Sequence, residues 1–451
     1  MAVDETLLIA LPLLLLAAAA LLVAAAPPQW ALLGMVLAAN VDVVSPAMGT
    51  LASDRVGLTN TLKHLSLPLM FAWRMGLRPG PVVRLTSIGV LWGGFVAYTA
   101  LSVTRSPYPT AGLKFVTYLV LLGLLVTAAA RAHANGTISA SVACRGLVLC
   151  GCLGLIQSYG LGNPYGGAEE RFTAFLQPQP FAQLVVVLTA IVVATGTLPL
   201  RASAVALAVA LIVANGSRIA ALGLLSVVAV RWLWAVARDG SAVRYVMLGA
   251  GTAALIIVTS TVDLLVPAES EMRAAALLKV GRSEGLRDIG TASFRLDMYA
   301  AVVDEIRARS MIDELVGSGT ASGGTLVTDG QFYGYGEDRF DPNRTIHNEY
   351  LRVAYELGVI GAAVGVALLL GLAAELWRGL REDRGAAALC ALVAAPAVLS
   401  FLATENVLAS GLAGSGLALS LVVGGILAGI QEESTLFAET PGFAPAGARW
   451  C

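Results

Sequence analysis

Residues Val353–Ala374 read VAYELGVIGAAVGVALLLGLAA, and Glu356 is the only charged side chain among them. A run of about 20 apolar residues is long enough to cross a bilayer as a helix. Seven further apolar stretches, each with few or no charges, lie elsewhere in the chain: Leu7–Ala25, Val83–Leu101, Leu113–Ala130, Phe181–Gly196, Ile219–Val236, Val246–Val262 and Leu417–Ile430. This repeated pattern predicts a multi-spanning membrane protein.

The composition argues against a soluble enzyme, a nucleic-acid-binding protein and a secreted disulfide-rich protein. Of the 451 residues, 57% are hydrophobic and 13% are charged, whereas a typical soluble domain has roughly 45–50% and 25%. The net charge of -1 offers no attraction for a nucleic acid or another polyanion. Cys150 and Cys152 form a pair without the second pair that a zinc site needs, so we expect the five cysteines to pack rather than to bind metal or form disulfides.

Division of the chain at proline, glycine and charge clusters gives about 12–13 candidate spans, of which those near Leu62 and Ala202 are short. We therefore predict an all-α polytopic membrane protein with one large extracytoplasmic loop domain between the tenth and eleventh spans. The predicted parts are an N-terminal transmembrane bundle, the loop domain, C-terminal transmembrane helices and a polar C-terminal tail, at residues 1–262, 263–346, 347–430 and 431–451. Small residues four apart predict close helix–helix packing at Gly89/Gly93, Gly361/Gly365 and Gly425/Gly429.

The predicted loop domain, Asp263–Ile346, carries 14 acidic and 9 basic side chains. Within it, Ser293–Val316 has the spacing of a single amphipathic helix that ends at Gly317-Ser-Gly319. Its apolar stripe consists of Phe294, Met298, Val302 and Ile306. If this domain lies outside the cytoplasm and the spans alternate, the short inside loops hold twelve basic residues and the short outside loops hold six. The positive-inside rule therefore favours an extracytoplasmic loop domain.

Three residues are candidates for chemistry. His347 lies where the loop domain enters a span, and histidine is the side chain best suited to act as a base near neutral pH. Arg218 lies between two apolar runs, where a guanidinium is costly unless it binds something or reaches water. Arg295 lies at the start of the amphipathic helix, where it either faces solvent or binds an anion.

These residues fall within motifs that resemble the bacterial O-antigen ligase and O-antigen polymerase superfamily. The resemblance covers roughly Arg171 to Gly371, and beyond that range it extends only to hydropathy. The matching motifs, in chain order, are Arg171–Ala182 (RFTAFLQPQPFA), Gly216-Ser217-Arg218, the arginine Arg295, Gly317-Ser-Gly319, His347-Asn-Glu-Tyr-Leu351 and Glu356-Leu-Gly358-Val-Ile-Gly361.

The resemblance implies a GT-C-like, membrane-embedded glycosyltransferase in the bacterial cytoplasmic (inner) membrane, with its active site on the extracytoplasmic face. It implies a polyprenyl (undecaprenyl) diphosphate-linked glycan as donor and a glycan, lipid or protein acceptor, with membrane lipid around the site. It implies no cofactor, no metal, no nucleotide sugar and no nucleic acid. The implied catalytic residues are His347, Arg218 and Arg295, and the implied substrate-binding residues are Arg171, Ser217, Asn348 and Tyr350.

The residue types fit this chemistry independently of the resemblance. A departing diphosphate needs cationic donors, and a guanidinium can hold it with two parallel hydrogen bonds. Attack by an acceptor hydroxyl needs a base, for which a neutral histidine is suited.

A secondary transporter or a lipid-linked-glycan translocase is the main alternative. It explains the spans equally well, and the polar residues Asn40, Asp42, Glu405 and Asn406 in apolar surroundings would then be ion sites. Against it, the hydropathy shows no internal repeat, and alternating access does not need a single large loop. A structural scaffold or sensor is a third class. Only the glycosyltransferase requires Arg218, Arg295 and His347 to converge.

Overall fold

The computed structural model describes residues 5–40, 65–76, 87–157, 172, 178–239, 292–329, 346, 348–382, 385–404, 407–408 and 412–428. Nearly all of these residues are helical, and none of them is in a β-strand. Six helices are long and apolar enough to cross a membrane, at Ser87–Arg105, Pro109–Ala134, Leu198–Asn215, Ile219–Val236, Glu349–Arg381 and Gly385–Ala403. Shorter apolar helices lie at Leu14–Ala24, Pro28–Ala39, Ala140–Leu155, Gln179–Thr195 and Gly414–Ala428. The prediction of an all-α, multi-pass membrane protein is confirmed.

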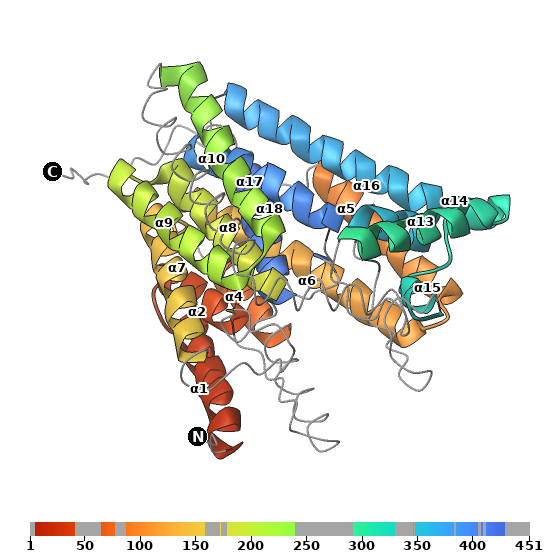
Figure 1. Ribbon diagram of the computed structural model, residues 1–451, viewed down its shortest axis with the longest axis horizontal. Coiled ribbons are helices and arrows are strands. Elements are labelled where there is room, and N and C mark those ends of the chain that lie inside the picture. Colours follow the sequence, from red (N-terminus) through yellow and green to blue (C-terminus); the bar gives the residue numbers. More distant parts are fainter. Residues whose placement is uncertain are drawn as a thin grey trace, which may run out of the picture.

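The helices form two groups, and α8 (Pro178–Thr195) lies at the centre of the larger one. Every residue of α8 from Phe181 to Ala194 is buried. Helices α7 (Ala140–Leu155), α9 (Leu198–Asn215), α10 (Arg218–Asp239) and α17 (Gly385–Thr404) surround it (Figure 1). A helix that is hydrophobic on all sides is stable only when other helices or lipid cover it completely. Helices α1 (Glu5–Ala24), α2 (Pro28–Ala39) and α4 (Leu67–Gly76) complete this body on its N-terminal side.

Helix α18 (Leu417–Ala428) follows the π-helical turn η4 (Leu412–Gly416) and packs closely on two neighbours. A Cβ at Gly424 would lie 2.7 Å from Ala129 Cβ of α6 (Pro109–Ala134), and one at Gly425 would lie 3.0 Å from Ala387 O of α17. The predicted packing role of Gly425 is therefore confirmed. For Gly93 it is wrong, because nothing lies within 4 Å of a Cβ at that position. Spacing alone does not reveal which face of a helix meets another helix.

The two spans that the sequence predicts to be short differ from each other. The one near Leu62 contains α4, which has 10 residues. The one near Ala202 is α9, which has 18 residues and is long enough to be a candidate span. The prediction of a short span there is wrong, because Arg201 falls in the first turn of a helix that begins earlier, at Leu198. The predicted span near Val246 lies outside the described residues.

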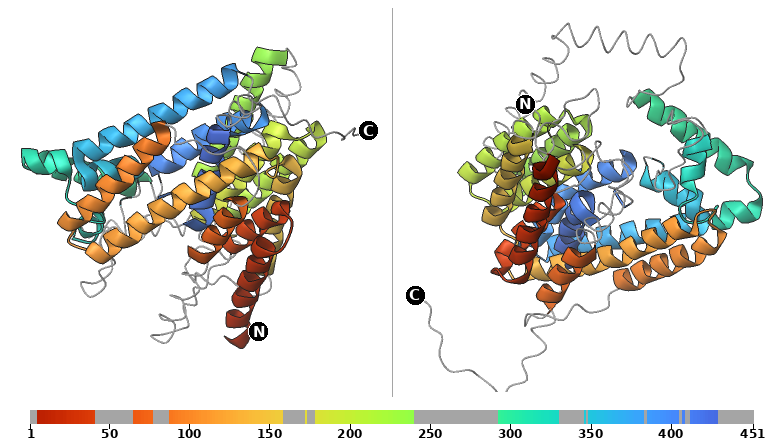
Figure 2. Two further views of the ribbon diagram at one scale, coloured as in Figure 1. Left: turned by 180° about the vertical axis from the view of Figure 1, so that it is seen from behind. Right: turned by 90° about the horizontal axis from the view of Figure 1, so that it is seen from below.

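A second group of long helices extends from the larger body toward the loop domain. It consists of α5 (Ser87–Ser102) with the short turn η2 (Val103–Arg105), α6 and α16 (Glu349–Arg381). Helices α13 (Ala292–Ala308), α14 (Met311–Val316) and α15 (Gly323–Asp329) gather at the end of this group (Figures 1 and 2). The turn that contains Arg105 lies at the same end, as the predicted alternation of loops requires. The boundary at residue 263 and the tail 431–451 lie outside the described residues.

Candidate functional site

The described residues include only parts of the predicted site. Arg218 begins α10 and Arg295 lies in the first turn of α13, but neither side chain belongs to the described part of the structure. Arg171 and His347 lie outside the described residues altogether. The site is therefore built from the residues next to them in the chain, whose contacts are defined.

The segment after Arg171 is joined to the turn before Arg218. The Phe172 backbone N–H donates to Ala214 O at 3.1 Å, and the buried Asn215 Nδ2 donates to Phe172 O at 2.9 Å. Asn215 ends α9 and Gly216 follows it in the left-handed conformation, with φ +70°. Two motifs that are more than forty residues apart in the sequence are thus brought together by a pair of hydrogen bonds.

Ser217 begins α10 by accepting a hydrogen bond from the Ala220 backbone N–H at 3.3 Å. This is the usual role of a serine before a helix, because it satisfies one of the backbone donors that the first turn leaves free. The turn Gly216-Ser217 therefore sets where α10 begins, and Arg218 is the first residue of that helix. Helix N-termini favour anions, since their free N–H groups and the helix dipole both attract negative charge.

Helix α13 uses the predicted apolar stripe. Met298 and Val302 are fully buried in a cluster with Ile346 and Tyr355, and Ile306 packs against this cluster. The prediction is thus confirmed for three of its four residues, and the side chain of Phe294 is outside the description. Because Ile346 directly precedes His347, the same cluster ties the chain that leads to the histidine onto α13.

The predicted single helix Ser293–Val316 is in fact two helices. Helix α13 ends at Ala308, and Ser310 begins α14 by accepting a hydrogen bond from the Asp313 backbone N–H at 3.2 Å. A serine hydroxyl offers the backbone an alternative to continuous helix, which explains the break. The predicted stop is confirmed, since α14 ends at Val316 and Gly317 follows it with φ +78°.

The motif at Gly317 docks directly on the motif at Gly358. Helix α16 is kinked at Gly358, which has φ +65° and ψ -164°. A Cβ at Gly358 would lie 2.5 Å from both Gly317 N and Leu315 O, and a Cβ at Gly317 would collide with Glu356 O. Only glycine fits at either position, because the backbone conformation is left-handed and the facing atoms are backbone.

Hydrogen bonds complete this contact. The backbone N–H groups of Ser318 and Gly319 donate to Tyr355 O at 3.2 Å and to Glu356 O at 2.9 Å. The buried carboxylate of Glu356 accepts a further bond from Gly323 N at 3.3 Å. The loop after α14 therefore satisfies the carbonyl groups that the kink in α16 leaves free.

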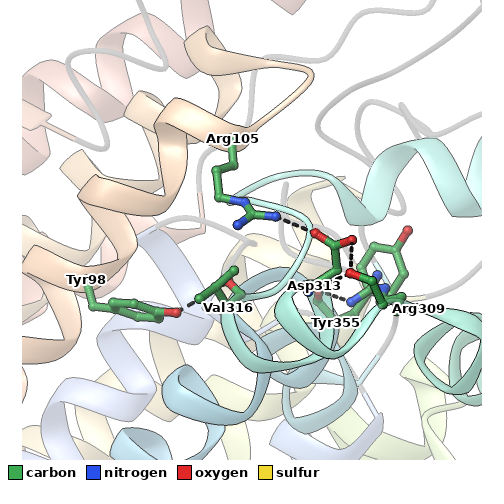
Figure 3. A network of polar contacts seen from close by, with 7 residues as sticks. Tyr98, Arg105, Arg309, Asp313, Val316 and Tyr355 are labelled. Carbon is green, nitrogen blue, oxygen red and sulfur yellow. Dashed lines mark hydrogen bonds and ion pairs between the residues drawn. The ribbon is translucent and has the colours of Figure 1, made fainter.

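A polar network fixes α14 between α5 and α16 (Figure 3). The guanidinium of Arg309 lies over the Tyr355 ring, 3.9 Å from its centroid, and donates to Tyr355 O at 2.8 Å. Arg105 pairs with Asp313 at 2.6 Å. The hydroxyl of Ser310 and the guanidinium of Arg105 both stabilise the Asp313 carboxylate and hold its pKa below the usual range. The pair therefore persists until the pH falls below the ordinary range of an aspartate.

Helix α10 meets the last turns of α17. A Cβ at Gly223 would lie 3.2 Å from both Ala397 Cβ and the ring of Phe401. Gly223 lies five residues after Arg218, or about 7.5 Å along a helix axis. The N-terminus of α10 is thus held near the C-terminal end of α17.

Helix α13 meets the same end of α17. The Tyr299 hydroxyl donates to Ala403 O at 3.4 Å. Tyr299 lies four residues after Arg295, and residues four apart share one face of a helix. The N-terminal turn of α13 is therefore placed one turn away from a contact with α17.

The start of α16 meets this end of α17 as well. Tyr350, which is 40% exposed, donates from its hydroxyl to Leu399 O at 3.4 Å. The Glu349 carboxylate accepts a hydrogen bond from Leu408 N, just beyond α17, at 2.6 Å. Asn348 begins α16 by accepting a bond from Leu351 N at 3.0 Å. The side chains that make these contacts belong to the three residues that follow His347.

A buried ion pair holds the first turn of α16. Arg352 Nη2 lies 2.6 Å from Glu349 Oε2, and both side chains are 3% exposed. The Arg352 guanidinium also lies over the ring of Phe115 in α6, 4.2 Å from its centroid. The pair thus links the residues after His347 to α6 and to Leu408 beyond α17.

Sequence reasoning missed Asn215, Glu349, Arg352 and Glu356 as residues that build the site. A signal existed for three of them, because charged side chains in or beside an apolar run are functional candidates by default. Asn215 gave a weaker signal, since a polar residue before Gly216-Ser217 is typical of any loop. Its contact with Phe172 depends on the fold and is not visible in the sequence.

Comparison with protein families supports the motifs. Residues 203–366 match the family model described as O-antigen ligase, a range that contains Arg218, Arg295, His347 and both glycine motifs but not Arg171. None of the curated proteins compared with the chain matches it. The family's broad activity is of the glycosyltransferase-like ligase or polymerase type, on a lipid-linked glycan and an acceptor. Residues 203–366 are therefore similar to the O-antigen ligase family, and they lie in a chain that has six helices long and apolar enough to cross a membrane.

Proposed function

We propose that the chain transfers a glycan from a polyprenyl diphosphate carrier to an acceptor hydroxyl at the extracytoplasmic face of the bacterial cytoplasmic membrane. It would act either as an O-antigen ligase or as a surface-polysaccharide polymerase. The observation that carries the proposal is the meeting of three segments at the C-terminal end of α17. These segments carry Arg218, Arg295 and His347, and they are held there through Gly223, Tyr299 and Tyr350.

In this proposal Arg218 and Arg295 hold the diphosphate. The acceptor oxygen attacks the anomeric carbon, the bond from that carbon to the diphosphate oxygen breaks, and the acceptor proton passes to His347. The two guanidinium groups, one of them carried by the first residue of α10, offset the charge that grows on the departing diphosphate. Arg171, Ser217, Asn348 and Tyr350 would contact the substrates around this centre.

The convergence also bears on the alternative. A transporter needs ion sites along its spans but gives no reason for the segments that carry a histidine and two arginines to meet at one end of α17. A glycosyltransferase needs these groups in one place, because the bond that forms and the bond that breaks share one carbon atom. The arrangement of α10, α13 and α16 around α17 therefore favours transfer over transport.

The arginine assignment predicts a large loss of activity. Arg218→Ala or Arg295→Ala should reduce transition-state stabilisation by about 2–4 kcal/mol, the usual effect of losing one donor to a developing negative charge. Arg→Lys should restore only part of the rate, because lysine lacks the planar fork. The measurement is transfer by purified protein in lipid, with a polyprenyl-diphosphate glycan and with either a lipid or a second lipid-linked glycan as acceptor.

A matched control comes from the same helix as Arg295. Arg307 is 76% exposed and its recorded ion-pair partner, Asp304, is equally exposed, so Arg307→Ala should transfer at the parent rate. Near-parent rates for both Arg218→Ala and Arg295→Ala, at equal amounts of folded protein, would contradict the proposal. The acceptor that becomes glycosylated distinguishes a ligase from a polymerase.

The proposed orientation predicts a labelling pattern in intact cells. In a chain without its native cysteines, Asp304→Cys should react with an impermeant maleimide, because α13 would face the outside and this side chain is 76% exposed. Arg381→Cys, at the C-terminal end of α16 and away from α13, should react only after lysis. The reverse pattern would place the loop domain in the cytoplasm and remove the proposed chemistry from the outer face.

A further inference from the structure

Helix α14 exposes three large apolar side chains. Met311 is 85% exposed, Ile312 is 69% exposed and Leu315 is 47% exposed. Among residues 298–326, whose side chains the structure describes, these are the large hydrophobic ones that stand exposed. Large exposed apolar patches usually mark a surface that another molecule covers. We therefore expect these three side chains of α14 to contact a partner or a lipid surface.

The apolar residues form one side of the helix. Each helical residue turns by about 100°, which places Met311, Ile312, Leu315 and Val316 on one arc and Asp313 and Glu314 on the opposite arc. Asp313 is already satisfied by Arg105 and Ser310. Because Asp313 and Glu314 both lie on the opposite arc, the apolar side of α14 can enter a nonpolar environment without taking either carboxylate with it.

The position of α14 identifies that environment. Arg105, which pairs with Asp313, is the last residue of the candidate span Ser87–Arg105, and Tyr98 of the same span donates to Val316 O at 3.3 Å. On its other side, α14 lies against Gly358 through Leu315 O. Helix α14 is thus fixed near one end of each of two candidate spans, where we expect the lipid border.

The exposed surface of α14 also adjoins the exposed surface of a span. Val359 and Ile360 of α16, which directly follow Gly358, are 52% and 37% exposed, and Leu370 further along the same helix is 66% exposed. In a membrane-spanning helix such side chains face lipid. The apolar side of α14 begins where this lipid-facing surface ends.

We propose that α14 is an interfacial anchor, with Met311, Ile312 and Leu315 inserted among membrane lipids at the border of the bilayer. Amphipathic helices that bind a membrane surface lie in the plane of the interface, with the apolar face among the lipids. Because α14 continues into the docking contact at Gly317, the anchor fixes the loop domain against the kink of α16. This inference concerns a lipid surface and does not depend on the proposed transfer reaction.

The test measures contact with lipid directly. In a chain without its native cysteines, a cysteine at Ile312 carries the fluorophore NBD, and the labelled protein is placed in nanodiscs with or without lipids brominated near the headgroup. The emission should shift to shorter wavelength and should be quenched by the brominated lipid. Asp304→Cys on α13, 76% exposed, is the matched control and should show neither effect.

Two results would overturn the proposal. Emission at Ile312→Cys that equals that of Asp304→Cys would show a water-exposed helix. A shift to shorter wavelength without quenching by brominated lipid would show that a protein surface, such as a second copy of the chain, covers α14. Met311→Cys provides a second labelling position, because its 85% exposed side chain can be replaced without disturbing packing if Ile312→Cys fails to give monodisperse protein.

Discussion

Arg352→Met is expected to destabilise the folded protein by roughly 3–5 kcal/mol, because it leaves the buried carboxylate of Glu349 without its cation. Glu349→Leu should cost a similar amount, since it strands the guanidinium over the Phe115 ring. The double replacement should recover much of this loss, because no unpaired charge then remains in the interior. Recovery should stop short of the parent, since Leu408 N also loses its acceptor.

Thermal unfolding in detergent, followed by intrinsic fluorescence, measures these differences. Arg307→Met is the matched control, because its ion pair with Asp304 is 76% exposed on both sides and such pairs contribute about 0–1 kcal/mol. If the single variants at Glu349 and Arg352 unfold at the same temperature as the control, the buried pair contributes little to stability. The double variant separates a lost ion pair from lost side-chain volume, because only the former is relieved by removing the second charge.

His347→Ala is expected to slow glycan transfer by roughly 10²–10⁴-fold, the usual contribution of general-base catalysis, while binding of the lipid-linked donor is largely kept. The same role predicts that the rate of the parent falls as the pH drops through about 6–7, because the protonated imidazole cannot accept a proton. Transfer in reconstituted lipid across this pH range, together with a separate donor-binding measurement, provides the check.

His347→Gln distinguishes a base from a group that only orients the acceptor. Glutamine can hydrogen-bond to a hydroxyl but cannot take its proton near neutral pH. A glutamine variant with the parent rate and a flat pH profile would leave His347 as a residue of the helix entry. The substitution should leave folding intact, because the residues on either side are unchanged. Ile346 stays in the α13 cluster, and Asn348 still begins α16.

Much of the helical architecture could be predicted, because hydropathy and helical spacing are local properties. The apolar runs predict the candidate spans, and Met298, Val302 and Ile306 give the buried face of α13. The stop at Gly317 was also predictable, since a glycine readily takes the positive φ with which the chain leaves this helix. Each of these features depends on residues within a few turns of one another.

Other features could not be predicted, because they depend on contacts between distant parts of the chain. The run Val353–Ala374 gives no sign that Gly358 interrupts it, since a glycine in an apolar span is also typical of close packing. The kink exists because α14 docks against it. Similarly, Glu349 and Arg352 have the spacing of an ordinary surface pair, and only the fold reveals that both are buried.

The contact between Gly317 and Gly358 has a genetic consequence. The atoms that face each glycine belong to the main chain, which every residue type shares. No substitution on the opposite side can therefore make room for a side chain at either position. In a selection for restored growth, Gly358→Ala should yield true revertants or changes that shift α14 as a whole. A compensating exchange across the contact should not arise, so the two glycines are constrained individually rather than as a co-varying pair.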